Sequence, residues 1–323
     1  MDLNIDFEVP NFLIHHYYAS GSISVLLNGL VIYLLIFHNG KIGSFKFYLL
    51  SFQISCVLLD LHVTMLMQPV GLLPICAGYS NGILSKVFKL HSHILMTLFV
   101  FFLSLQINTL IICFLRKHKA IMNLRSTSSV PNWIYHVLLG MIVFLIWSLT
   151  FTLSMSSESY EKQLEMLDIF HPLVSTKFRN LPEFQYYYLN TWMLIFFTLT
   201  IFETMKSFLM VSGTVTQMYR ALKEVECQLS SQTLAKHKSA LRSLIAQFAT
   251  TPVAILPGGM IACTVIFPTE YSQKISWCCM MVMTTHSTLN SLVVILTYPE
   301  FRKIVCFWDK SVKKSTAVAT VII

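Results

Sequence analysis

The chain has 323 residues, of which 55% are hydrophobic and only 12% are charged, and its mean hydropathy is +0.64. Because soluble domains carry about a quarter charged residues, this composition excludes a soluble domain and indicates a membrane protein with several crossings. The net charge of +8 does not indicate nucleic-acid binding, since a basic excess in membrane proteins commonly lies in the cytoplasmic loops.

Seven segments are long and apolar enough to cross a bilayer as helices. They lie at about 18–37, 47–67, 91–114, 133–155, 187–211, 244–267 and 275–298. The eight cysteines form no CxxC pair, so neither a metal site nor a disulfide framework is indicated. We therefore expect an all-α fold, a single seven-transmembrane helix bundle over residues 1–323, embedded in a lipid bilayer and without a cofactor.

The distribution of basic residues predicts the orientation of the bundle. Lys and Arg concentrate in the connections after the first, third and fifth segments and in the tail after the seventh. Such residues are retained on the cytoplasmic side. An odd number of crossings separates the termini, so the N-terminus is expected outside and the C-terminus in the cytoplasm.

The second segment contains an acid at a depth where charge is costly. Gln53, Cys56, Asp60 and Thr64 recur at helical spacing and share one face of an otherwise apolar helix. A carboxylate in the bilayer costs about 2–3 kcal/mol or more, so this face must look toward other helices or a water-filled cavity. Asp60 is either a ligand contact or, as we favour, a structural acid that ties this helix to its neighbours.

Polar residues of the third and seventh segments are expected to join this network. Asn108 lies in the third segment, and His286 and Asn290 share one face of the seventh. Together with Ser104 they predict a polar centre next to Asp60. A histidine at this depth is more often a satisfied structural group than a proton sensor.

The second outer connection, roughly 156–186, is the longest one on its face and is rich in Glu and Asp. It either covers an outer cavity or remains a solvated surface loop, and its composition favours the solvated loop.

Two charged residues lie inside the fifth segment. Glu203 and Lys206 stand at i and i+3, close enough to pair and so to lower the cost of insertion. The pair is either a lock that rearranges on activation or a static solution to two buried charges. We favour the static pair, because a buried ion pair is weak evidence of anything beyond its own satisfaction.

The sixth segment contains two prolines, Pro252 and Pro257. Each removes a backbone donor, so we expect a kinked helix.

Three stretches of the sequence carry a family resemblance. They are FKFYLLSFQISCVLLDLHVTMLMQPVGLLPICAGYSNGIL at 45–84, CFLRKHKAI at 113–121 and THSTLNSLVVILTYPEFRK at 285–303. With AQFATTPVAILP of the sixth segment they resemble the nematode serpentine chemoreceptors, class I (Sri) first and class H (Srh) next. The resemblance implies a G-protein-coupled receptor (GPCR) in the plasma membrane of sensory-neuron cilia, which binds an environmental small molecule and activates a heterotrimeric G protein.

This resemblance directs attention to the cytoplasmic ends of the third and fifth segments. There a basic cluster lies near an apolar stripe that continues the fifth helix beyond the membrane. A basic rim beside an apolar groove suits a docking helix of the G protein. The face that we expect to couple comprises Arg116, Lys117, Lys119, Met218, Leu222 and Val225.

Residues 299–313 are predicted to form a short amphipathic helix on the inner leaflet. Cys306 within it is a possible palmitoylation site, although an unmodified thiol is the simpler expectation.

The ligand is expected to enter from outside into an apolar and aromatic cavity between the third, fifth, sixth and seventh segments. Its candidate lining, chosen by depth in the membrane, is Met96, Tyr187, Trp192, Phe267 and Trp277. Each of these residues is equally suited to the lipid-facing aromatic belt.

The sequence lacks the motifs of common enzyme sites, namely Gly-x-Ser-x-Gly, His-Glu-x-x-His and a Gly-rich phosphate loop. The main alternative is a transporter or ligand-gated channel that uses the intramembrane charges. Many transporters show repeated halves, and we see no internal repeat here, which favours the receptor.

Overall fold

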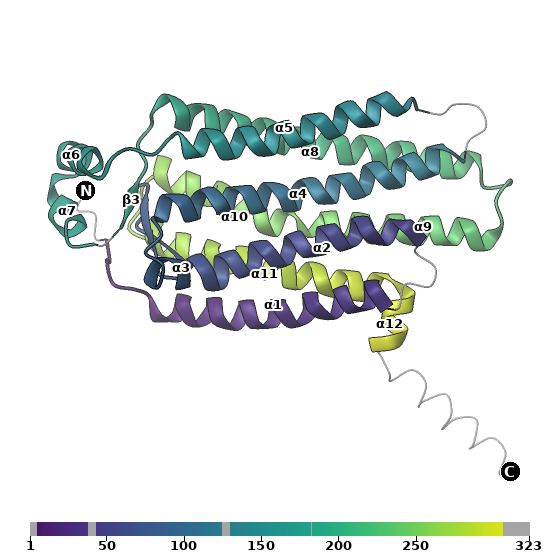
Figure 1. Ribbon diagram of the computed structural model, residues 1–323, viewed down its shortest axis with the longest axis horizontal. Helices are drawn as coiled ribbons and strands as arrows, with labels where there is room; N and C mark the ends of the chain where they lie inside the picture. The colour runs from purple at the N-terminus through teal and green to yellow at the C-terminus, as the bar shows by residue number, and fades with distance from the viewer. Residues whose placement is uncertain (1–4, 38–42, 125–129, 182, 306–323) are drawn as a thin grey trace, which may run out of the picture.

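Seven long helices lie side by side in the computed structural model, which describes residues 5–37, 43–124, 130–181 and 183–305 (Figure 1). They are α1 (Asn11–Phe37), α2 (Lys46–Leu61), α4 (Ser92–Met122), α5 (Asn132–Ser154), α8 (Thr191–Glu224), the pair α9 (Ser231–Thr250) and α10 (Pro252–Ile266), and α11 (Ser272–Thr297). A 3-10 turn (Gly43–Phe45) precedes α2, and a π-helix (His62–Met67) continues it. The predicted all-α seven-helix bundle is thereby confirmed.

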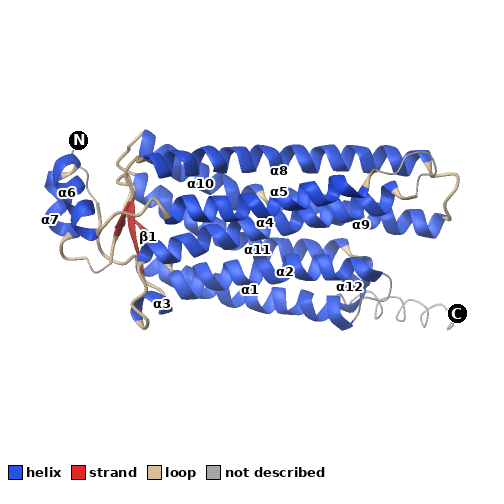
Figure 2. Cartoon of the chain, turned by 45° about the horizontal axis from the view of Figure 1, so that its top comes forward, coloured by secondary structure: helices blue, strands red, loops and turns tan. Residues whose placement is uncertain are grey.

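Smaller elements distinguish the two ends of the bundle (Figure 2). One end, called here the capped end, carries α3 (Ile83–Lys86), α6 (Tyr160–Phe170), α7 (Pro172–Phe178) and the strands β1 (Pro69–Gly71), β2 (Ala77–Ser80) and β3 (Gln185–Tyr186). The opposite end carries α12 (Pro299–Val305) and the turn between α8 and α9. The predicted inner-leaflet helix is therefore described only to Val305, and Cys306 lies outside the described residues.

The helices pack in a consistent order. Helix α4 contacts α2, α5 and α8, while α11 contacts α1, α9 and α10. The apolar core shared by these helices is concentrated toward the opposite end and includes Phe52, Phe114, Met218, Leu244 and Phe301. The largest cluster of buried apolar side chains therefore lies between the polar centre and the opposite end of the bundle.

The sixth crossing is interrupted at its first proline. Pro252 has no N–H to continue the helical ladder, and the Thr251 N–H bonds to the Phe248 carbonyl at 3.0 Å, one residue closer than in an α-helix. The chain therefore crosses as α9 and α10, joined at Thr251, while Pro257 lies inside α10. The helical hydrogen-bond ladder is thus interrupted at this joint, while Thr251 keeps helical dihedral angles, and a kink there stays a prediction.

The second outer connection is not a solvated loop, contrary to the expectation from its composition. Its α6 and α7 place Leu167, Val174 and Phe178 in a small core with Phe184, and Ile5 packs into the same core. Strand β3 adds to β2 in an antiparallel three-stranded sheet of order β1-β2-β3. The acidic residues lie mostly on the outer face of this connection, while its apolar residues pack inward. Helices α6 and α7 and strand β3 together form a lid, as this connection is called below.

Gly82, between β2 and α3 at the capped end, has no room for a side chain. A Cβ at Gly82 would clash with the Leu66 carbonyl and lie 2.7 Å from the Met67 carbonyl carbon. We expect Gly82→Ala to lower stability by about 2–3 kcal/mol, because backbone rather than a flexible side chain must move. The check is the thermal unfolding midpoint of the purified protein in nanodiscs. Gly140→Ala in α5 is the control, since nothing lies within 4 Å of its Cβ position, and an equal loss in both variants would contradict the account.

Candidate functional site

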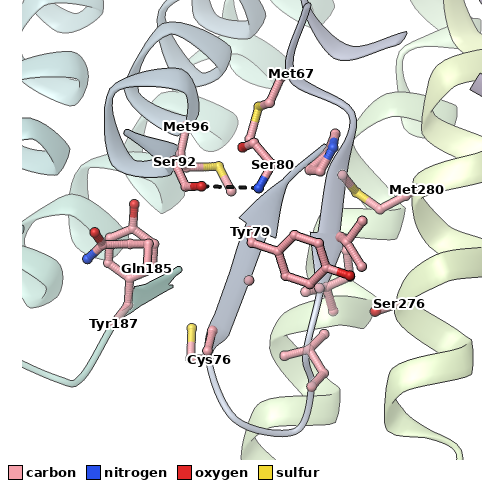
Figure 3. A pocket seen from close by; sticks show the side chains of 17 residues that line it. Met67, Cys76, Tyr79, Ser80, Ser92, Met96, Gln185, Tyr187, Ser276 and Met280 are labelled. Atoms are coloured by element: carbon pink, nitrogen blue, oxygen red, sulfur yellow. Dashed lines mark hydrogen bonds between the residues drawn. The ribbon is translucent and has the colours of Figure 1, made fainter. Parts of the chain in front are cut away.

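A cavity of about 160 Å³ lies beneath the sheet at the capped end (Figure 3). The sheet supplies one wall, with Cys76, Tyr79 and Ser80. The helices supply Met67, Met96, Ile261, Ser276 and Met280, and the segment after β3 supplies Tyr187. The cavity is therefore formed by the lid and the helices together, at the depth where a ligand arriving from the capped end would first contact the bundle.

Tyr187 is fixed in the cavity wall by a histidine. The His93 Nε2 lies 3.1 Å from the Ser154 carbonyl, which can only accept, so this nitrogen carries the proton. In the neutral imidazole Nδ1 is then an acceptor, and the Tyr187 hydroxyl 2.9 Å away donates to it. Burial raises the pKa of Tyr187 above its usual range, which keeps the phenol neutral.

The five residues predicted to line the pocket separate into three groups. Met96 and Tyr187 line the cavity. Trp277 is 5% exposed and lies behind the wall, where its indole N–H donates to the Gly71 carbonyl at 3.2 Å.

Trp192 and Phe267 are corrections, because they are 37% and 72% exposed on the outside of the bundle and do not line the cavity. They were chosen by expected depth, and depth alone does not determine whether a side chain points into or out of the bundle.

The acid of α2 belongs to a network centred on helix α1. The Asn28 amide donates to Ser24 Oγ at 2.7 Å and to Ser287 Oγ at 2.9 Å. Its oxygen accepts from Ser291 Oγ at 2.9 Å and from Gln53, and Ser24 in turn donates to Asp60. These contacts tie α1, α2 and α11 together around buried groups. Sequence reasoning missed Ser24 and Asn28, although Ser20, Ser24 and Asn28 repeat every four residues on one helical face.

His286 connects different helices from those around Asp60. Its Nδ1 lies 3.3 Å from the Gln106 amide of α4, and its Nε2 lies 3.3 Å from Thr250 Oγ1 at the end of α9. Gln106 also donates to Cys56 Sγ at 3.1 Å, and Asn290 lies 3.9 Å from the same sulfur. The histidine therefore joins α4 and α11 to the helix that is broken at Thr251.

Asn108 does not join the group around Asp60, and this part of the predicted network is corrected. Its amide donates to Glu203 Oε1 at 2.9 Å, and its oxygen accepts from Lys206 Nζ at 3.1 Å. Glu203 and Lys206 are 2.8 Å apart and are 5% and 7% exposed. The three side chains close a triangle between α4 and α8, so the lysine lies inside the protein and does not reach for the headgroups.

The basic residues at the opposite end of α4 stack on aromatic rings. Arg116 lies over Tyr48 at 5.3 Å from the ring centroid, Lys117 over Phe45 at 5.5 Å and Lys119 over Tyr135 at 5.4 Å. Such contacts orient the charges and stabilise the end of the helix by about 0.5–1 kcal/mol each when exposed.

The predicted apolar half of the coupling face is closed in this structure. Met218, Leu222 and Val225 are 0%, 1% and 3% exposed, and Met218 and Leu222 belong to the apolar core that contains Ile121 and Leu241. The expectation of an open groove at these residues is therefore corrected. The stripe is covered by the protein's own helices, because α8 packs against α4 and α5 and the α9 residues Leu241 and Leu244 belong to the same core.

A direct consequence concerns the double substitution Leu222→Asp with Val225→Asp. We expect it to destabilise the protein by more than about 3 kcal/mol, since two carboxylates would enter an apolar core. The amount of receptor at the cell surface should therefore fall, so that a loss of signalling in this variant would not report on G-protein coupling. Tyr219→Asp, at a position that is 49% exposed on the same helix, should leave delivery near normal. Normal delivery of the double variant, measured by surface labelling, would show that these residues are not core.

The sequence matches the model of a known receptor family over most of its length. The sequence model of the family described as Serpentine type 7TM GPCR chemoreceptor Sri matches residues 3–305. The chain belongs to this family. No curated protein sequence matches this Sri-type receptor. Among solved structures it resembles squid rhodopsin, with a TM-score of 0.57 and 14% identity over 95% of this chain and 88% of that chain, and at this identity the likeness concerns the fold.

Membership of this family settles the broad function. The protein is a multi-pass membrane chemoreceptor of the G-protein-coupled type and not an enzyme. The transporter or channel alternative is not favoured. Small-molecule binding and G-protein coupling are general properties of such receptors.

Proposed function

We propose that this receptor binds its ligand in the cavity beneath the sheet and activates a heterotrimeric G protein at the opposite end. The observation that supports it most directly is the small, partly open cavity, to which the sheet and helices α4, α10 and α11 all contribute. A ligand there contacts both the lid and the broken sixth crossing, through Ile261 of α10.

We propose that the capped end faces the outside and that the C-terminal side faces the cytoplasm. Lys and Arg gather at the opposite end, with Arg116, Lys117 and Lys119 on α4 and Arg220 and Lys223 on α8. This is the arrangement that the retention of positive charge in the cytoplasm produces. The proposed location is the plasma membrane of a sensory neuron, in its cilium.

We propose that coupling begins when α9 moves away from α4 and α11 and thereby exposes the apolar stripe of α8. In this structure Met218 and Leu222 are covered, so a docking helix needs that movement. The break at Thr251 separates α9 from α10, and His286 contacts both Thr250 and α4 at this joint. A ligand-induced shift of α10 would therefore reach α9 at its hinge.

The test is a cell line that expresses the receptor with a G-protein reporter while neutral volatile compounds are applied. The expected result is a concentration-dependent response that G-protein blockade removes. The same cells carry an N-terminal epitope, which should label without permeabilisation. An epitope reached only after permeabilisation, or an ion current that persists without any G protein, would contradict the proposal.

A further inference from the structure

The lining of the cavity excludes a charged ligand. None of the described side chains that line it carries a charge at neutral pH. Burial raises the pKa of Cys76 to about 11 and that of Tyr79 to about 12, the latter with help from Asp6, so both groups remain protonated. An ion entering this space would lose its hydration without gaining a partner.

Three thioethers give the cavity an adaptable apolar surface. Met67, Met96 and Met280 come from three different helical segments and line the same space. Methionine is flexible and polarizable and makes favourable contacts with rings and other apolar groups. A cavity of about 150 Å³ holds one benzene molecule, so a space of this size suits roughly six to nine non-hydrogen atoms.

The hydroxyl protons of the lining are already donated to protein acceptors, with one exception. Tyr187 donates to His93, Ser92 to the Glu183 carbonyl at 2.8 Å, and Ser276 to the Gln273 carbonyl at 2.9 Å. Tyr79 donates to the Phe7 carbonyl at 3.3 Å. These groups therefore retain acceptor capacity but have no proton left for a ligand.

Ser80 is the exception. Its residue is 7% exposed and its backbone N–H is bonded to Ser92 Oγ at 3.1 Å, as Figure 3 shows. Its side-chain oxygen has no hydrogen-bond partner among the described residues and almost no accessible surface, so it meets a ligand in the cavity when its side chain rotates about the Cα–Cβ bond. A buried hydroxyl without a partner costs about 1–3 kcal/mol, and a bound polar atom would remove that cost.

We infer that the receptor selects a small, neutral, mostly apolar molecule with a single oxygen function, and that Ser80 hydrogen-bonds this oxygen. This inference rests on the proposed function and specifies its ligand class. Because Ser80 holds the one hydroxyl proton of the described lining that is not already donated, a ketone or aldehyde accepts from it directly. An alcohol accepts from Ser80 and also donates to the oxygen of Tyr187 or Ser276.

The experiment measures binding without any G protein. Purified receptor in nanodiscs is heated in the presence of cyclohexane, cyclohexanone, cyclohexanol or cyclohexanecarboxylate, and apparent affinities are obtained from the shift of the unfolding midpoint. The ketone and the alcohol should bind about five- to tenfold more tightly than the hydrocarbon, because this is the gain in affinity that one additional hydrogen bond gives. The carboxylate should produce no shift.

Ser80→Ala isolates the proposed contact. It should remove the advantage of the ketone and the alcohol while leaving the affinity for cyclohexane unchanged. The ligand-free variant should unfold at the same or a higher temperature, because the substitution removes an unpartnered buried hydroxyl. Ser148→Ala should behave as the wild type, because Ser148 is half-buried on α5 and its hydroxyl donates to the Phe144 carbonyl of the same helix, away from the cavity.

Three outcomes overturn the inference: tighter binding of the carboxylate, an oxygen preference that survives Ser80→Ala, or no shift with any of the neutral compounds. The failure of the proposed function looks different. If the binding pattern is found but bound ligand never stimulates nucleotide exchange on a G protein, the ligand class stands and the coupling proposal fails. If exchange is stimulated only by charged or much larger compounds, coupling stands and the ligand class fails.

Discussion

Replacing Lys206 alone by methionine should lower the free energy of unfolding by about 3–5 kcal/mol, because Glu203 would be left as an unpaired charge in the bilayer. Glu203 is 5% exposed and depends on Lys206 and Asn108 for its contacts. Adding Glu203→Gln to Lys206→Met should restore most of the loss, since a neutral amide can bond to Asn108. Thermal unfolding in nanodiscs measures both effects.

Lys86→Met is the control for this pair, because Lys86 is exposed at the capped end and its removal should change stability by less than about 0.5 kcal/mol. The double variant also decides between a static pair and a lock. We expect basal G-protein activation to stay within about twofold of the wild type, as a static pair requires. A large increase in basal activation at normal surface level would show that the pair restrains the inactive state.

Asn28→Ala should be nearly as damaging, with a loss of about 2–4 kcal/mol. Asn28 is fully buried and bonds to Ser24 and Ser287 through its nitrogen and to Gln53 and Ser291 through its oxygen. Alanine leaves these partners in a space that water cannot enter freely. Each unsatisfied group carries its own desolvation cost.

The measurement for Asn28 is again the unfolding midpoint, compared with Asn123→Ala at the exposed end of α4. We expect a small change of the unfolding midpoint for Asn123→Ala and a large decrease for Asn28→Ala. Equal, small changes in both variants would mean that the contacts around Asn28 do not hold α1 against α2 and α11.

The sequence predicted the crossings well because twenty apolar residues in a row have few alternatives. The depth of a side chain follows from its position in such a run, but its direction does not. Trp192 and Phe267 were chosen by expected depth and lie on the outside, whereas Met96 and Tyr187 line the cavity. Whether a side chain points inward or outward depends on how the helices are ordered in the bundle. That order follows from contacts between segments that are far apart in the sequence.

The polar centre also could be predicted only in part, because a sequence shows the face of each helix but not the helix that this face contacts. Gln53, Asp60 and His286 were found from their own helical faces, but their partners on α1 and α4 were not. The spacing of Ser20, Ser24 and Asn28 was available as a signal and would have indicated that α1 faces α2. The assignment of Asn108 to Glu203 and Lys206 needed the knowledge that α4 packs against α8.

The two ends of the bundle were misread for a related reason. The open docking surface expected on the apolar stripe beyond the membrane is absent, because Met218 and Leu222 are buried in a core that also holds residues of α4 and α9. The acidic second connection was taken as solvated, yet Leu167 and Phe178 fold it into a lid. In both cases an amphipathic pattern was present, and the sequence could not say which surface it covers.

The most direct test of the account is ligand-stimulated nucleotide exchange on a purified G protein, measured with the wild-type receptor and with Met96→Trp in nanodiscs. The tryptophan fills the cavity beneath the sheet, while binding of the G protein at the opposite end is untouched. The account predicts stimulation by an active compound in the wild type and its loss in Met96→Trp, with the unfolding midpoint of the ligand-free protein kept within about 3 °C. Equal stimulation of both proteins would contradict it.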